Sequence, residues 1–219
     1  MRKVFQAELH QVGEQLVEIS RLVTEAMEKA NTAFTTADTE LAQDVIASDA
    51  RIDFLQNHLD ERAIEILALQ GPVASDLRVI VGSLRMSASL ERMGDLARHI
   101  AQLTRMRYPE LVIPEHLRPT FAQFAEHDIA ISRSLTELLD TRNLDLARDI
   151  NRHNEQVNEL HAGIFKAIAS PDFNAAPSTA VDVALASRYF ERFADHGISV
   201  SRKVTYLVTG EWTTNGNVG

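Results

Sequence analysis

Apolar residues along this chain recur at intervals of three and four, the spacing that places side chains on one face of an α-helix. The strict alternation of apolar and polar residues that is typical of strands is nearly absent. The helical pattern covers six segments, about residues 2–34, 38–70, 73–108, 117–140, 143–169 and 178–209. We therefore expect an all-α protein with six long helices.

Residues that cap or break helices separate these segments. Asp38 or a neighbouring threonine is placed to cap the second helix, with Glu40 in its first turn. Gly71-Pro72 combines a residue that ends helices with one that suits the first turn of the next helix. Ser178 is placed to cap the sixth helix. Short connections of this kind favour antiparallel neighbours.

A proline cluster at Pro109, Pro114 and Pro119 divides the chain near its middle. The pattern predicts two tandem antiparallel three-helix bundles, residues 1–110 and 111–210, followed by a flexible tail at 211–219. An extended coiled coil is the alternative, and it would need sustained heptads without these prolines.

The composition narrows the classes of function. The chain has 31 acidic and 22 basic residues and a net charge of −9, which disfavours nucleic acid as a partner. It contains no cysteine, so disulfides, thiolate zinc sites and cysteine nucleophiles are excluded. We recognise neither a secretory signal nor a membrane-spanning segment, and we expect a cytoplasmic protein.

Acidic segments repeat along the chain. Residues 91–95, Glu-Arg-Met-Gly-Asp, recur 100 residues later as Glu-Arg-Phe-Ala-Asp at 191–195. The segment that contains Asp49 and Asp53 aligns at an offset of 105 with one in which Asn154 and Asn158 replace both aspartates. Duplication of a three-helix unit is the simplest explanation.

The register of the first repeat suggests that its carboxylates meet. Asp53 and Asp49 lie 18 and 22 residues before Gly71, while Glu91 and Asp95 lie 20 and 24 residues after it. In an antiparallel hairpin these four side chains stand at nearly the same height. Residues four apart on a helix are also stacked, so each acidic pair needs solvent, arginine or a cation to offset its repulsion.

Facing carboxylates would make a metal site. All-oxygen sets suit magnesium, manganese or iron, histidines nearby could add nitrogen ligands, and zinc stays a further candidate. The candidate ligands are Asp49, Asp53, Glu91, Asp95, Glu191 and Asp195, with Asn154, Asn158, His99 and His196 as weaker candidates. We expect the second cluster to bind more weakly, because asparagine carries no charge. The alternative is a solvated surface on which arginines such as Arg92 and Arg188 pair with the acids.

The repeated segments also resemble a known family. The chain resembles the PhoU family in five segments, namely residues 90–97, 190–196, 69–78 and 49–53 and Val-Thr-Tyr-Leu-Val-Thr-Gly-Glu at 204–211. The resemblance covers about residues 2–212 and implies a six-helix, two-repeat fold. It also implies metal binding at the Glu/Asp-x-x-x-Asp pairs, from which Asn154 and Asn158 depart.

The same resemblance implies a function. PhoU proteins restrain phosphate uptake and the phosphate-starvation response when phosphate is plentiful. They act as adaptors between the phosphate ABC transporter, through its ATPase subunit, and the phosphate-sensing histidine kinase. We therefore expect a regulator that is no enzyme and that reaches the membrane only through its partners. A homodimer remains an open alternative.

Two other functions stay as alternatives. A carboxylate-bridged metalloenzyme of the ferritin-like class would use Glu-x-x-His pairs, and no histidine here has a glutamate three residues before it. Nucleotide-binding glycine motifs are also lacking. A structural helical adaptor of another pathway would share the fold. Its deletion would leave phosphate-responsive transcription unchanged.

Overall fold

The computed structural model describes residues 2–72 and 74–211, and in this part of the chain the secondary structure is entirely helical. The elements are α1 (Arg2–Thr36), α2 (Thr39–Gln70), α3 (Ser75–Arg107), a short 3-10 helix η1 (Glu115–Leu117), α4 (Arg118–Thr141), α5 (Asp145–Ala169) and α6 (Pro177–Thr209). The predicted all-α class is confirmed. Val73, the predicted start of the third helix, and residues 212–219 of the predicted tail lie outside the described residues.

The helix ends show which local signals act. The carboxylate of Asp38 accepts a hydrogen bond from the Leu41 amide at 2.9 Å and caps α2, as predicted. Gly71 follows α2 in the left-handed conformation, at a φ of 52°. The prediction that Ser178 caps the sixth helix is wrong. Pro177 occupies the first turn of α6 instead, where its missing N–H costs no hydrogen bond.

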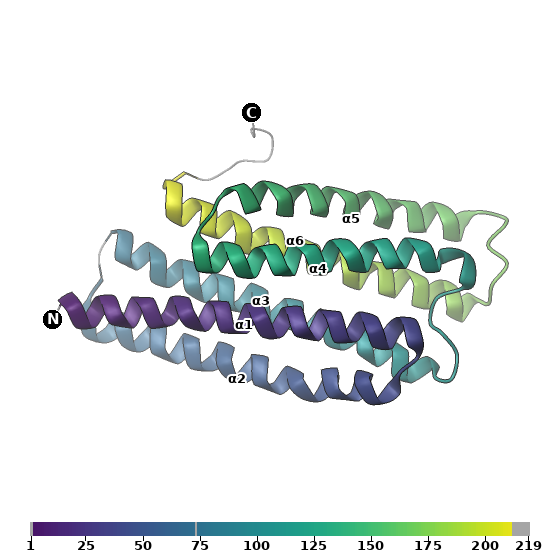
Figure 1. The fold of residues 1–219 in the computed structure, drawn as a ribbon, viewed down its shortest axis with the longest axis horizontal. Coiled ribbons are helices and arrows are strands. Elements are labelled where there is room, and N and C mark those ends of the chain that lie inside the picture. The colour runs from purple at the N-terminus through teal and green to yellow at the C-terminus, as the bar shows by residue number, and fades with distance from the viewer. Residues whose placement is uncertain (1, 73, 212–219) are drawn as a thin grey trace.

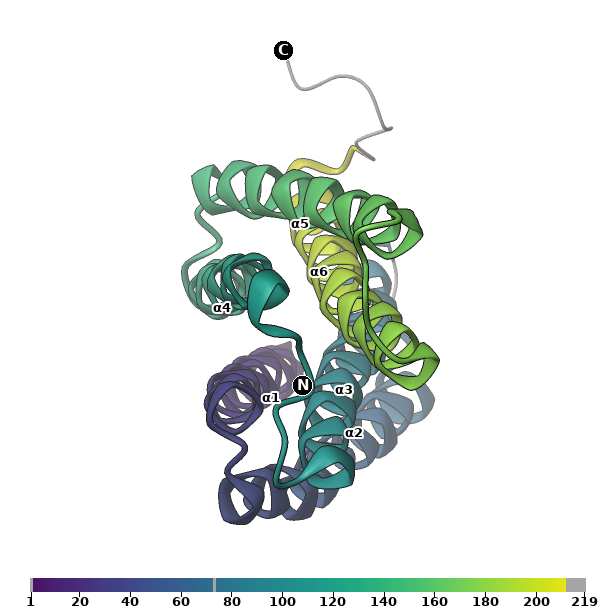
Figure 2. The same cartoon turned by 90° about the vertical axis from the view of Figure 1, so that its right-hand side faces the viewer.

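The six helices run roughly along the long axis of the molecule, as two three-helix units lying against each other (Figure 1). The end-on view shows α2 and α5 on opposite outer sides, with α1, α3, α4 and α6 between them (Figure 2). Across the junction α1 packs against α4 and α3 packs against α6. None of the helices in the described residues is long and apolar enough to cross a membrane.

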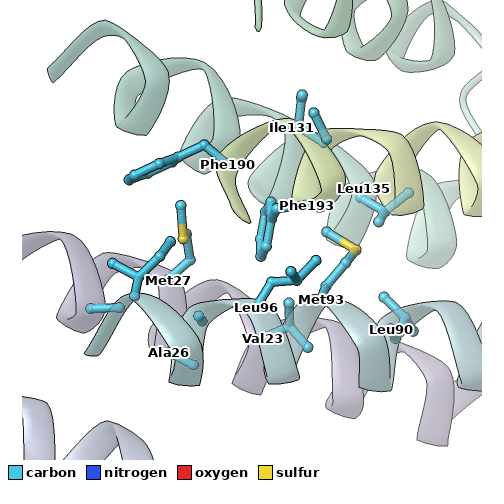
Figure 3. Close-up of a cluster of buried hydrophobic side chains, with 14 of the residues drawn as sticks. Val23, Ala26, Met27, Leu90, Met93, Leu96, Ile131, Leu135, Phe190 and Phe193 are labelled. Carbon is cyan, nitrogen blue, oxygen red and sulfur yellow. The ribbon is translucent and has the colours of Figure 1, made fainter. Parts of the chain in front are cut away.

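One hydrophobic core extends through both units. Figure 3 shows Phe190 and Phe193 of α6 reaching toward Met27 of α1 and toward Met93 and Leu96 of α3. Four rings from α1, α4 and α6 also pack together with centroids 5.4–6.0 Å apart, namely Phe34, Phe121, Phe124 and Phe190. Because burying each large apolar side chain is worth roughly 1.5–3 kcal/mol, this shared core holds the two units together.

Corresponding positions of the two repeats meet at both ends of the contact between α3 and α6. Gly82 of α3 lies against Leu207 of α6, since a Cβ added to the glycine would come within 3.2 Å of Leu207 Cδ1. The positions 100 residues away hold Asp182 and Arg107, which form an ion pair of 2.5 Å. The same pair of positions therefore forms a glycine–leucine contact at one end of the α3–α6 contact and an ion pair at the other.

Candidate metal-binding face

The acidic residues of the first repeat come together on the face formed by α2 and α3. Asp49 is only 8% exposed, and its carboxylate is repelled by the charges of Asp53 and Asp95. The carboxylate of Glu91 is repelled by the charges of Asp95, Asp53 and Asp49. Burial, followed by the neighbouring Asp95, raises the pKa of Glu91. The predicted register therefore places the four carboxylates within electrostatic reach of one another.

A glycine allows α2 and α3 to approach closely at this point. A Cβ on Gly94 would lie 2.9 Å from Ile52 Cδ1 and 3.5 Å from Asp49 Oδ1. Ile52 is almost fully buried, so it cannot move aside without disturbing the core. The small residue inside the acidic motif thus brings Asp49 of α2 beside Asp95 of α3.

Arginine side chains supply the positive charge among these carboxylates. The guanidinium of Arg98 donates from Nε to Asp49 Oδ2 and from Nη2 to Asp95 Oδ1, both at 2.5 Å. Arg92 lies 2.7 Å from Asp95 and 3.5 Å from Glu91. Arg98 therefore bridges α2 and α3, at a place where a bound cation would have to supply the same charge.

The two bridged carboxylates respond differently to their surroundings. Burial raises the pKa of Asp49, and the opposing charge of Arg98 does not overcome it. Burial also disfavours the charged form of Asp95, but the hydrogen bonds and charges of Arg98 and Arg92 outweigh it and lower the pKa. Asp95 is thus held as the carboxylate, and Asp49 is the more easily protonated partner.

His99 lies at the edge of this cluster. Its ring packs at 5.1 Å from the ring of Tyr189 on α6, and among the described residues its buried Nδ1 has no hydrogen-bond partner. Burial, reinforced by the charge of Arg98, lowers the pKa of His99. The imidazole is therefore kept neutral, which is the form that ligates metals.

The second repeat has a different arrangement. Glu191 is 8% exposed and receives a hydrogen bond of 2.5 Å from Arg188, whereas Asp195 is exposed. On α5, Asn158 is exposed, and the buried Oδ1 of Asn154 has no hydrogen-bond partner in the described part of the chain. His196 is half-buried, and burial lowers its pKa. The two acids of this motif therefore diverge in environment.

In the part of the chain that the structure describes, these side chains do not form a geometry that holds a metal ion. Within residues 2–72 and 74–211, no group of three or more histidine, aspartate or glutamate side chains is positioned to hold a metal ion. The donor types of the first repeat nevertheless suit a hard cation, because four carboxylates lie within electrostatic reach of one another on two helices. Binding of a metal ion here would require the Arg98 guanidinium to move away from Asp49 and Asp95.

The chain also matches a known family of proteins. A family model described as the PhoU domain matches residues 16–104 and residues 122–204. The chain belongs to the PhoU family. The resemblance drawn from the repeated acidic segments is thus confirmed.

Individual PhoU proteins match over their full lengths. The chain is 36% identical over 210 residues to the phosphate-specific transport system accessory protein PhoU homolog 2 of Mycobacterium bovis, covering 96% of this chain and 99% of that protein. It is 35% identical over 218 residues to PhoU homolog 1 of Mycobacterium leprae, covering 100% and 98%. The crystal structure of PhoU from Pseudomonas aeruginosa matches with a TM-score of 0.81 at 28% identity, covering 94% of this chain and all of that one. The predicted PhoU-like fold is confirmed.

In this member of the PhoU family, Arg98 and Asp128 were not predicted from the sequence as residues of the site. Arg98 stands three residues after Asp95, a spacing that allows contact on one helix. Asp128 is fully buried in α4, and neither of its oxygens has a hydrogen-bond partner among the described residues. Burial, with the charge of Glu191, raises its pKa well above the ordinary value. A carboxylate within the apolar stripe of Phe124, Ile131 and Leu135 was the available signal.

A pair of histidines was also missed. Nδ1 of His127 on α4 lies 2.9 Å from Nδ1 of His153 on α5, so one ring donates and the other accepts. Burial and the neighbouring His127 lower the pKa of His153. Nothing in the spacing of these residues indicated the contact, because it depends on how α4 and α5 are rotated about their axes.

Proposed function

We propose that this protein is a negative regulator of phosphate uptake and of the phosphate-starvation response. It acts in the cytoplasm as an adaptor between the ATPase subunit of the phosphate ABC transporter and the phosphate-sensing histidine kinase. The observation that carries the proposal is the match over nearly the whole chain to proteins named as accessory proteins of the phosphate-specific transport system. The protein itself catalyses no reaction in this proposal.

The mechanism we propose is differential binding. An adaptor that binds one state of the kinase more tightly than another shifts the population toward that state without chemistry. The transporter would set which state is favoured while phosphate is plentiful. A helical body with one continuous core suits this role, because it holds separate surfaces in fixed relation to each other.

Metal binding is a further part of this proposal. Asp49, Asp53, Glu91 and Asp95 would hold a hard or intermediate cation, namely iron, manganese, magnesium or zinc. The cation would supply the charge compensation that Arg98 supplies in this structure and would join α2 to α3. Glu191 and Asp195 would form a weaker site, because asparagines replace the aspartates of α5.

Purified components test the adaptor. We expect the immobilised protein to bind both the transporter ATPase and the cytoplasmic part of the histidine kinase in biolayer interferometry. We also expect the affinity for the kinase to change when the ATPase is present, because an adaptor couples its two sites. Binding to neither component would contradict the proposal.

A further inference from the structure

A groove lies between the beginning of α3 and the end of α6, at the end of the molecule where the N-terminus lies in Figure 1. Its volume is about 280 Å³. Leu77, Val81 and Leu207 form its apolar part, and Arg78, Arg85 and Lys203 are its cations. Gly82 allows the close approach of α6 at this level. Two helices thus enclose a surface that is both apolar and positively charged.

The apolar part of the groove is open to solvent. Leu77 is 41% exposed and Val81 is 42% exposed, and they lie one turn apart on the same face of α3. Apolar side chains that gather in a concave surface rimmed by charge are typical of binding sites.

Among the residues that the structure describes, the cations of the groove form no ion pair with a carboxylate. Within the described residues, no aspartate or glutamate oxygen lies within 4.0 Å of Arg78, Arg85 or Lys203, although Arg98 and Arg107 are both paired. The ammonium of Lys203 donates instead to the backbone oxygen and hydroxyl of Ser199, at 3.0 and 2.5 Å. Burial and the charge of Arg85 lower the pKa of Lys203. In a chain of net charge −9, this is a local excess of positive charge.

At the corresponding end of the α3–α6 contact, other residue types stand at the equivalent positions. Asp182 stands where the groove has Gly82, and it pairs with Arg107, which stands where the groove has Leu207. The counterparts of the three cations are Ser178, Leu185 and Leu103. The charge of the groove is therefore a property of this place and does not follow from the repeated fold.

We propose that this groove binds an acidic amphipathic helix of a partner protein, an inference that rests on the adaptor function proposed above. The apolar face of the helix would pack on Leu77, Val81 and Leu207, in the way that amphipathic helices fill hydrophobic grooves. Its carboxylates would pair with the cations of the groove. Arg78 and Arg85 are two helical turns apart, so glutamates spaced two turns apart match them.

A designed peptide tests the groove directly. The probe is a rhodamine-labelled amphipathic helix of about 18 residues, with leucines one turn apart and glutamates two turns apart on one face. Fluorescence anisotropy should show that it binds at least about tenfold more tightly than the same peptide with lysines in place of the glutamates. Arg85→Glu and Val81→Asp should each weaken binding by about tenfold or more.

Matched controls separate the groove from general charge and polarity. Arg202→Glu makes the same charge change beside Lys203, on an exposed residue that does not line the groove. Val181→Asp makes the same change at the exposed position that corresponds to Val81. We expect both controls to bind the acidic peptide within about twofold of the wild type. Thermal unfolding verifies that all four variants are folded.

Four results would overturn the proposal. The first is an acidic peptide that binds no more tightly than its lysine version. The second is equal weakening of peptide binding by Arg85→Glu and Arg202→Glu. Binding of phosphatidylglycerol vesicles that Arg85→Glu abolishes, with no peptide binding, would identify a lipid surface. A dimer in sedimentation that Val81→Asp dissociates would identify a second copy as the occupant. None of these results bears on the regulation of phosphate-starvation genes, which tests the adaptor function separately.

Discussion

Two buried carboxylates of this protein, Asp49 and Asp128, differ in whether a cation lies beside them. Asp49 shares the guanidinium of Arg98 with Asp95, so its negative charge is compensated by a hydrogen bond of 2.5 Å. Asp128 is fully buried and lies near another acid, Glu191, with no hydrogen-bond partner among the described residues. Burying a charge without a partner is costly, so burial raises the pKa of Asp128 and favours its protonated form.

Replacing Asp128 should therefore stabilise the protein. Asp128→Leu removes an unsatisfied polar group from an apolar stripe, and we expect it to raise the free energy of unfolding by about 1–3 kcal/mol. Urea denaturation at neutral pH measures the change. Asp182→Leu serves as the contrast, because this buried carboxylate is paired with Arg107 and its loss should destabilise. A loss of stability in Asp128→Leu would contradict the account.

The pH dependence of stability gives a second readout for Asp128. Its folded pKa lies above the ordinary value of 3.8, so the folded protein holds this proton more tightly than the unfolded chain does. Its contribution is thus fully present below about pH 3.8 and is lost as the pH rises toward the raised value. Asp128→Leu should remove this loss, and the gain over wild type should be larger at about pH 8 than at about pH 5.

Metal content tests the acidic pairs. Elemental analysis of tag-free protein should find iron, manganese, magnesium or zinc in the wild type. The double variant Glu91→Ala/Asp95→Ala should lose more metal than Glu191→Ala/Asp195→Ala, because only the first cluster has four carboxylates. Arg98→Gln should increase the metal content by removing the competing charge. If all of these proteins stay metal-free after incubation with each cation, the acids are arginine-paired surfaces.

At the scale of single helices, the sequence was a good guide where local physics decides. The apolar spacing, the cap at Asp38 and the helix end at Gly71 depend only on neighbouring residues, and these predictions are confirmed. Pro72 was expected in the first turn of the next helix, but α3 begins only at Ser75. The start of α6 was misplaced because Ser178 and Pro177 both suit a helix N-terminus, and proline was the stronger signal. The arginine and histidine pairings could not be predicted from the sequence, because the rotation of each helix about its axis depends on tertiary packing.

The close contact of α2 and α3 at Gly94 can be tested by substitution. Gly94→Ala would place a methyl group 2.9 Å from the buried Ile52, and we expect it to lower the free energy of unfolding by about 1–3 kcal/mol. Gly163→Ala on α5 is the matched control, since no atom lies within 4 Å of the added Cβ. It should stabilise by about 0.5–1 kcal/mol through helix propensity. Equal effects in urea denaturation would show that the contact is not tight.

At the scale of the whole molecule, the repeats share one core, which periodicity alone did not reveal. Each repeat carries an apolar face on its first and third helices, and these faces bury each other across α1, α3, α4 and α6. The outer surfaces of the α2–α3 and α5–α6 hairpins are left for other contacts (Figure 2). This arrangement places the acidic clusters and the cationic groove on a single body, which suits the adaptor function proposed above.

The most direct test of the regulatory role is expression of phosphate-starvation genes in a strain that lacks this protein. A transcriptional reporter is measured in phosphate-rich medium, in the deletion strain and in the same strain complemented with the wild-type gene. The account predicts that the reporter is active in the deletion strain and silent after complementation. A reporter that stays silent in the deletion strain would contradict the account and would favour a structural adaptor of another pathway.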